Sequence, residues 1–145
     1  MNSTPPFVAQ EQRNTCALAC LRMILAHHGT HVTESDLLPL VSLVQGGLDP
    51  DQIATVARHY GLHAEIAELD VSTIRDLVAQ GRFPIVMIDR RPLDNEFTIH
   101  AVIAIRFTRH FVTVLDPLCG ERRLSLRKFT EAQRRVLWAV ICEPR

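Results

Sequence analysis

The chain has 145 residues, of which 47% are hydrophobic and 22% are charged, as in globular proteins that bury a sizeable core. Lys plus Arg and Asp plus Glu number 16 each, so the formal net charge is zero. This balance disfavours a nucleic-acid binder, which carries a basic excess. No apolar run is long enough to span a membrane, and residues 1–6 lack the pattern of a signal peptide. We therefore expect one cytoplasmic domain over residues 1–145, with no membrane span.

The first half of the chain predicts helices. Residues 15–28 are apolar on nearly every face, which is typical of a buried helix. Asn14 or Thr15 is the expected N-cap, and Gly29 is expected to end the helix. Further helices are predicted over residues 33–41, 49–61 and 70–81.

The second half is rich in short apolar runs with β-branched residues, which predict strands. In chain order these strands are expected over residues 63–69, 84–88, 97–105, 111–115, 124–126 and 136–142. Residues 90–96 read as a loop, residues 106–110 as a hairpin connection, and a short helix is expected near Phe129. Helices followed by mainly antiparallel strands predict an α+β fold.

Cysteine is the first residue type that could carry chemistry. In a cytoplasmic chain, the four cysteines are expected to be buried thiols or a nucleophile rather than a disulfide framework. Cys16 lies in the first turn of the buried helix, where free N–H groups and the helix dipole favour a thiolate. Cys20 lies one turn further in and is expected in the core. A zinc site at Cys16 and Cys20 would need a distant third ligand.

A thiol nucleophile needs a base, and the base needs a partner that orients it. His100 is the outstanding histidine because it lies inside an apolar strand. If the hairpin turn is centred on Thr108, His100 lies directly opposite Asp116, close enough for a hydrogen bond. A one-residue change of register would remove this match. Cys16, His100 and Asp116 thus form a candidate nucleophile, base and orienting carboxylate.

An oxyanion hole would complete such a site. The Cys16 main-chain N–H can donate one hydrogen bond, and a side-chain amide just upstream can donate a second. Gln10 and Gln12 are both available, and spacing alone does not choose between them.

The stretch from Gln10 through Cys16 to Gly29 resembles the nucleophile region of bacteriocin-processing cysteine peptidases, the papain-like domains of peptide-exporting ABC transporters. The likeness continues through Gly46-Gly47-Leu48, His100 and Asp116-Pro117, and it covers essentially the whole chain. In that family a Gln stands six residues before the catalytic Cys, so the resemblance selects Gln10. The chain departs from the family at Ala17, where Gly is usual, and at His27-His28, which replace an aromatic pair.

The resemblance implies a papain-like α+β fold and a cysteine peptidase that uses no metal or organic cofactor. By position, Cys16 is the nucleophile, His100 the general base and acid, Asp116 its orienting partner and Gln10 the oxyanion donor. The expected substrate is a peptide with a double-glycine leader, and the expected partner is a separate peptide exporter, because no transporter sequence follows. Two other hypotheses about the function remain. The same residues could serve an acyl transferase or amidase, or the domain could bind peptides without cleaving them.

Overall fold

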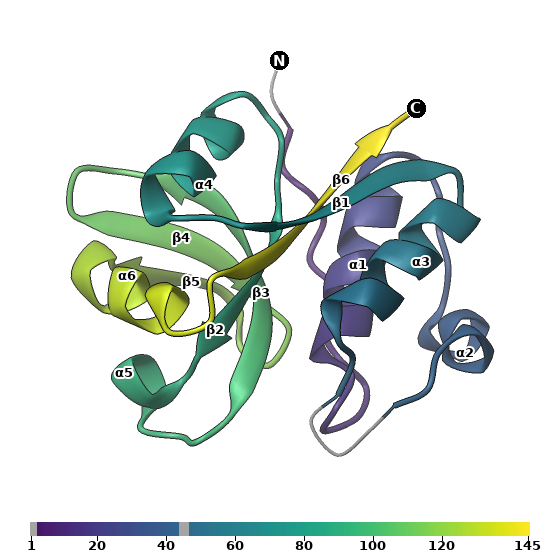
Figure 1. Cartoon of the computed structure of the whole chain (residues 1–145), viewed down its shortest axis with the longest axis horizontal. Coiled ribbons are helices and arrows are strands. Elements are labelled where there is room, and N and C mark those ends of the chain that lie inside the picture. The colour runs from purple at the N-terminus through teal and green to yellow at the C-terminus, as the bar shows by residue number, and fades with distance from the viewer. Residues whose placement is uncertain (1–2, 44–46) are drawn as a thin grey trace.

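The computed structural model describes residues 3–43 and 47–145, and Figure 1 shows the arrangement of its elements. The helices are α1 (Cys16–His27), α2 (Glu34–Leu37), the 3-10 helix η1 (Leu38–Leu40), α3 (Pro50–His59), α4 (Val71–Ala79), α5 (Arg91–Asp94) and α6 (Leu126–Arg134). The strands are β1 (Leu62–Glu68), β2 (Ile85–Asp89), β3 (Ile99–Phe107), β4 (Phe111–Asp116), β5 (Gly120–Ser125) and β6 (Trp138–Pro144).

The strands form one six-stranded sheet in the order β1-β6-β2-β3-β4-β5. Every neighbouring pair is antiparallel. The C-terminal strand β6 lies between β1 and β2, so it joins the helical first half of the chain to the β2–β5 meander. The predicted α+β architecture is confirmed.

Helices cover both faces of this sheet (Figure 1). On one face Ile85, Ile103 and their neighbours pack in a cluster with α1 and α3. On the other face Val86, Val102 and their neighbours pack with α4 and α6. Successive strand residues point to opposite faces, so β2 and β3 need apolar residues at consecutive positions. This explains why both strands read as continuous apolar runs.

The helices begin close to the predicted boundaries, and side chains cap α2, α3 and α4. Asp49 and Asp70 accept hydrogen bonds from the main chain of the first turns of α3 and α4. Thr33 forms a reciprocal capping box with Asp36 at the start of α2. Gly29 follows α1 at φ 90°, a conformation that glycine adopts without strain.

Three segments differ from the expectation. The strand predicted over residues 124–126 is β5, which runs from Gly120 to Ser125, and Leu126 already belongs to α6. Residues 90–96, predicted as a loop, contain the single-turn helix α5, in which Pro92 lies early and Asn95 ends the turn at φ 56°. The β3–β4 connection is shorter than expected, because β3 runs on to Phe107. In the expected glycine pair 46–47, Gly46 lies outside the described residues, and Gly47 approaches the Asn14 carbonyl so closely that a Cβ atom would lie 3.3 Å from it.

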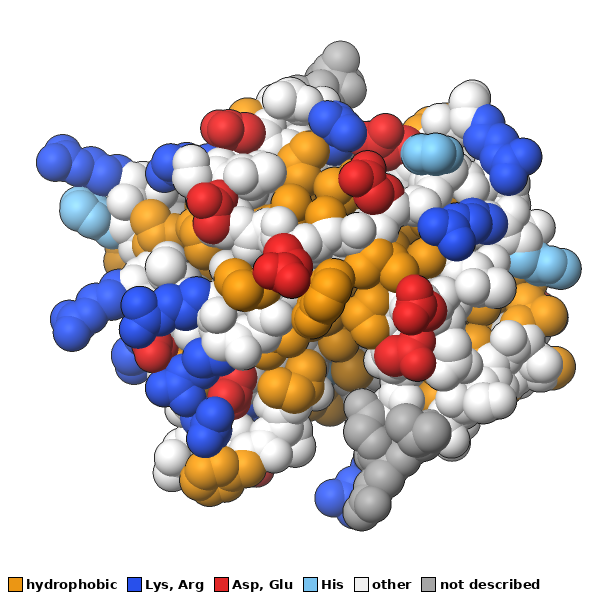
Figure 2. Space-filling view, in the orientation of Figure 1, with side chains coloured by type: hydrophobic (Ala, Val, Ile, Leu, Met, Phe, Trp, Pro, Cys, Tyr) orange, Lys and Arg blue, Asp and Glu red, His pale blue; other side chains and the backbone are white. Residues whose placement is uncertain are grey.

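Figure 2 shows the surface in the same orientation. Hydrophobic side chains are exposed along the middle of this face, and Lys and Arg gather mainly at its margins. The described residues include no helix long and apolar enough to cross a membrane.

Candidate active site

Cys16 is the first residue of α1, and its thiol is only partly exposed. Thr15 precedes it and is fully buried, and its hydroxyl bonds to both the N–H and the carbonyl of Gln12. This local turn fixes the path of the chain into the helix and leaves the first N–H groups of α1 without a side-chain cap. The Ala17 side chain packs in the core and is 2% exposed, so its methyl group points away from the solvent side of Cys16.

His100 and Asp116 are joined by a hydrogen bond of 2.7 Å between Nε2 and Oδ1. Both side chains are buried. Both lie near the start of α1, since His100 lowers the pKa of Cys16 and the charge of Asp116 adds to the raised pKa of Cys20. The Asp116 Oδ1 atom also accepts the N–H of Leu118 at 2.9 Å, so the turn after β4 helps to hold the carboxylate.

The predicted register of this hairpin is wrong, although the predicted contact exists. Ile103 pairs with Leu115 and Ala104 with Val114, and a bulge lies between Ala104 and Arg106. Continuing this register puts His100 diagonal to Asp116 rather than opposite it. The slip is two residues, an even number, so both side chains remain on the same face. Diagonal neighbours lie within reach of long side chains.

The His100 imidazole also lies beside the Cys16 thiol, close enough to shift the thiol pKa through hydrogen bonding and charge. Burial alone would raise the pKa of the Cys16 thiol. Hydrogen bonding to His100 and its positive charge act in the opposite direction, as do main-chain hydrogen bonds from Ala101 and Ala17. Together they outweigh burial, and the pKa of Cys16 is lowered. The helix N-terminus acts in the same direction.

The same contacts shift the two partners of Cys16. Burial alone would lower the pKa of His100, but the hydrogen bonds and negative charges of Asp116 and Cys16 raise it to about 9. Burial alone would raise the pKa of Asp116, but His100, the Leu118 N–H and Arg122 lower it to about 2. The structure therefore brings together a thiol that ionises easily, an imidazole that is readily protonated and a carboxylate that stays charged.

The oxyanion-donor candidate Gln10 lies beside this group, because its main-chain N–H donates to the Pro117 carbonyl at 3.1 Å. Its Nε2 donates to the carbonyls of Gln12 at 2.7 Å and Arg13 at 3.2 Å. Its Oε1 is buried and has no hydrogen-bond partner in the part of the chain that the structure describes. Both amide hydrogens are thus used within the loop before α1.

Glu34 is a buried residue that the sequence analysis missed. It lies at the start of α2, is 2% exposed, and accepts hydrogen bonds from the Glu11 N–H at 3.3 Å and Gln12 Nε2 at 3.1 Å. It therefore anchors the loop that carries Gln10 and commits Gln12 to a structural bond. Only its position next to the Thr33 cap marked it in the sequence, and this gave no sign of its long-range contacts.

The other three cysteines have pKa values that are raised. Burial raises the pKa of Cys20 far above its usual value and that of Cys142 to about 12. Cys119 is exposed, although a buried thiol was expected, and its sulfur lies 3.9 Å from Arg122 Nη1. Among the described residues, no group of three or more Cys, His, Asp or Glu side chains is arranged to hold a metal ion.

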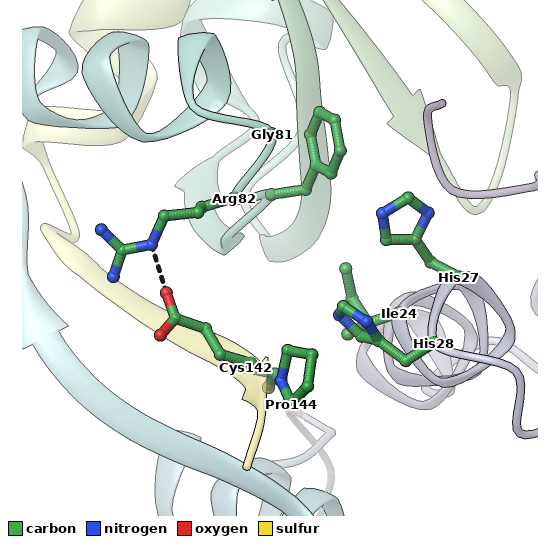
Figure 3. A pocket seen from close by; sticks show the side chains of 9 residues that line it. Ile24, His27, His28, Gly81, Arg82, Cys142 and Pro144 are labelled. Carbon is green, nitrogen blue, oxygen red and sulfur yellow. Dashed lines mark hydrogen bonds and ion pairs between the residues drawn. The ribbon is translucent and has the colours of Figure 1, made fainter. Parts of the chain in front are cut away.

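At the C-terminal end of α1, His27 and His28 line a cavity of about 250 Å³ together with Arg82, Cys142 and Glu143 (Figure 3). The rings of His27 and Phe83 meet edge to face with centroids 5.4 Å apart. The histidine pair thus fills a partly aromatic packing site. Burial lowers the pKa of both histidines.

A buried helix that begins with a cysteine, packed on an antiparallel sheet whose histidine meets the thiol, defines the chain as a cysteine peptidase of papain-like fold. The chain belongs to the peptidase C39 family, whose family model matches residues 4–144. This match confirms the resemblance that the sequence motifs carried. No curated protein matches the chain.

Solved structures of low sequence identity share the fold. A double glycine motif protease from an AMS/PCAT transporter, in complex with the leader peptide, is 18% identical with a TM-score of 0.81, over 99% of this chain and 94% of that chain. The peptidase domain of Streptococcus ComA, a bi-functional ABC transporter involved in a quorum sensing pathway, is 18% identical with a TM-score of 0.79, over 95% and 97%. A putative C39-like peptidase from Bacillus anthracis is 16% identical with a TM-score of 0.81, over 97% and 94%.

Proposed function

We propose that this chain hydrolyses a peptide bond with Cys16 as nucleophile, His100 as general base and acid, and Asp116 as the carboxylate that orients His100. The observation that carries the proposal is the 2.7 Å hydrogen bond between His100 and Asp116, made by the imidazole that lies beside the Cys16 thiol and lowers its pKa. Membership of the C39 family supports the same chemistry. We also propose that residues 1–145 form one domain, since a single sheet contains strands from both halves of the chain.

The reaction begins from a state in which the proton of the Cys16 thiol has already moved to the His100 imidazole. Because His100 Nε2 bonds to Asp116, Nδ1 is the ring nitrogen left for Cys16. The lowered pKa of Cys16 and the raised pKa of His100 favour a thiolate–imidazolium pair near neutral pH. The thiolate attacks the peptide carbonyl, a C–S bond forms, and the carbonyl oxygen becomes an oxyanion.

The oxyanion is held by the free main-chain N–H at the start of α1 and by the Gln10 amide. For the second contact, Gln10 must release one of its two bonds to the loop carbonyls. Rotation of the amide would also relieve the buried, unpartnered Oε1. Anchoring of the loop by Glu34 keeps the main chain in place during this change.

His100 then gives its proton to the leaving amine as the C–N bond breaks, which leaves a thioester on Cys16. The neutral imidazole removes a proton from water, the hydroxide attacks the thioester, and the acid product leaves as Cys16 regains its thiolate. Throughout these steps Asp116 keeps the ring oriented and stabilises its positive charge. All these steps use side chains of this protein.

We propose a peptide with a double-glycine leader as the substrate class. The support is the motif resemblance, the family, and the shared fold with a double glycine motif protease and a transporter peptidase domain. On the same grounds we propose that the enzyme acts in the cytoplasm on peptides destined for a separate exporter.

The test is digestion of matched peptides followed by mass spectrometry. One set carries a leader that ends in Gly-Gly, the other the same leader ending in Ala-Ala, and Cys16→Ala protein is the control. We expect Cys16-dependent cleavage directly after Gly-Gly and little cleavage after Ala-Ala. Cys16-dependent cleavage at other sites would reject the substrate class alone.

Adding a primary amine distinguishes hydrolysis from acyl transfer. For hydrolysis we expect two products whose masses sum to that of the substrate plus one water, a free acid and a free amine, at all amine concentrations tested. Predominant amide products would assign an acyl transferase. Binding of the leader with no product from folded protein would assign a peptide-binding module.

A further inference from the structure

Arg122, on β5, contacts the side of the Asp116 carboxylate that His100 leaves free. Its Nη1 donates to Asp116 Oδ2 at 3.2 Å. The opposite oxygen, Oδ1, is taken by His100 and by the Leu118 N–H. Both oxygens of Asp116 therefore have partners, and the carboxylate cannot rotate without losing a charge-assisted hydrogen bond.

The Arg122 guanidinium also forms an ion pair with Asp94 in α5. Nη2 donates to Oδ1 of Asp94 at 3.1 Å, and Nη1 lies 3.4 Å from Oδ2. Asp94 also accepts Arg90 Nε at 3.2 Å. The Arg122 side chain is 25% exposed and that of Asp94 is 21% exposed. The contacts are thus partly shielded from water, where ion pairs keep more of their strength than at the open surface.

We propose that Arg122 is a positioning residue for the Asp116 carboxylate and that Asp94 is its matched counter-charge. The inference rests on the proposed function, in which Asp116 orients His100. The four groups form a chain of alternating charge from β3 through β4 and β5 to α5. Arg122 without Asp94 would draw the Asp116 charge away from His100, whereas Asp94 without Arg122 would add unbalanced negative charge beside the site.

This arrangement makes a prediction that loss of packing alone does not make. Removing the positive charge of Arg122 raises the pKa of Cys16 and His100, because the surrounding potential becomes more negative. Removing the negative charge of Asp94 lowers both pKa values. The ionisable and charged side chains that face this group from the surrounding elements are Cys16 and Cys20 on α1, Cys119 in the β4–β5 turn, Arg122 on β5, and Asp94 with Arg90 at α5.

The test is the rate of Cys16 alkylation by iodoacetamide as a function of pH, which needs no substrate. All proteins carry Cys119→Ser so that the exposed thiol does not react, and mass spectrometry of the peptides confirms modification at Cys16. The variants are Arg122→Met, Arg122→Lys and Asp94→Asn. We expect the midpoint of thiolate formation to move up in Arg122→Met and down in Asp94→Asn, each by about half a pH unit or more. Arg122→Lys keeps the charge and is expected to stay near the reference.

Shifts in the same direction for Arg122→Met and Asp94→Asn, or no shift in either, would overturn the proposal. Thermal unfolding identifies any variant that does not fold, and the Arg122→Lys and Asp94→Asn pair then carries the test. The two hypotheses fail separately. A reference Cys16 with an ordinary thiol pKa would reject the proposed catalytic pair, whereas a lowered reference pKa with unshifted variants would reject only the role of Arg122.

Discussion

At the N-terminal end of α1, Cys16 meets His100, and at the C-terminal end of the same helix Cys142 shares a cavity with His27 and His28. The residue types match, yet the pKa of Cys16 is lowered while burial raises that of Cys142 to about 12. Likewise the pKa of His100 is raised, whereas burial lowers the pKa values of His27 and His28.

The difference comes from partners rather than from residue type. At the first end, Asp116 stabilises the imidazolium, and the imidazolium and the helix N-terminus stabilise the thiolate. At the second end, Glu143 is paired with Arg82 instead of with a histidine (Figure 3). Burial therefore dominates there: the charge of Glu143 opposes the shift at His28, and that of Arg58 opposes the shift at Cys142, but neither outweighs burial, and the neutral forms are favoured. The charged forms of cysteine and histidine are favoured only where charge and hydrogen bonds outweigh desolvation.

The largest expected effect separates the two ends directly. Cys16→Ala is expected to lower kcat/KM by roughly 10⁴-fold or more, because the nucleophile is lost. Cys142→Ala removes one buried sulfur and is expected to leave kcat/KM within about two-fold, at a cost of about 1 kcal/mol in unfolding free energy. Peptide hydrolysis and thermal unfolding measure both. Equal losses of activity in two folded variants would contradict the comparison.

Asp116→Asn tests the role of the carboxylate that is hydrogen-bonded to His100, a partner that His27 and His28 lack. The amide keeps the size of the side chain but loses its charge, so we expect kcat/KM to fall by roughly 10²-fold or more. The pKa of His100 should also fall from about 9 towards its usual value of about 6.5. Activity that depends on the protonated imidazole is then lost at lower pH than in the wild type. A pH–rate profile with an unmoved alkaline limb would contradict the role given to Asp116.

The oxyanion donor is tested by a matched pair of glutamines. Gln10→Ala is expected to reduce kcat by about two to three powers of ten with little change in KM. Gln12→Ala breaks the bond to buried Glu34 and is expected to lower stability by about 1–3 kcal/mol, with a smaller effect on kcat. If Gln10→Ala keeps the wild-type rate, its amide serves only the loop carbonyls that it contacts here.

The smallest expected effect on activity is that of Cys20→Ser. Cys20 lies one turn from Cys16 and is fully buried. The buried hydroxyl is expected to reduce unfolding free energy by about 1–3 kcal/mol while the rate stays close to that of the wild type. A folded Cys20→Ser protein without activity would show that the wrong cysteine has been assigned as nucleophile.

Much of the site could be predicted because its residues break local rules. A cysteine at a helix start and a histidine inside an apolar strand both stand out from their surroundings. The hairpin register was predicted wrongly, since the bulge between Ala104 and Arg106 has no clear signal in an apolar β-branched run. The contact between His100 and Asp116 was still predicted correctly, because the register error is two residues and both side chains remain on the same face of the hairpin.

Glu34 and Arg122 escaped prediction for a different reason. A glutamate in the first turn of a helix and an arginine on an edge strand are ordinary surface residues by sequence. Their importance comes from contacts across 22 residues in one case and 28 in the other. Such contacts depend on how the elements pack. The single turn of α5 was missed similarly, because four residues give too short a pattern to read.

The thiolate–imidazolium pair is tested most directly by NMR titration of the His100 imidazole in wild-type protein and in Cys16→Ala. We expect the wild-type ring to stay protonated up to a pH of about 9. In Cys16→Ala the pKa of His100 should be lower, because the negative partner is gone. A His100 ring that titrates near pH 6.5 in both proteins would contradict the ion pair on which the proposed mechanism rests.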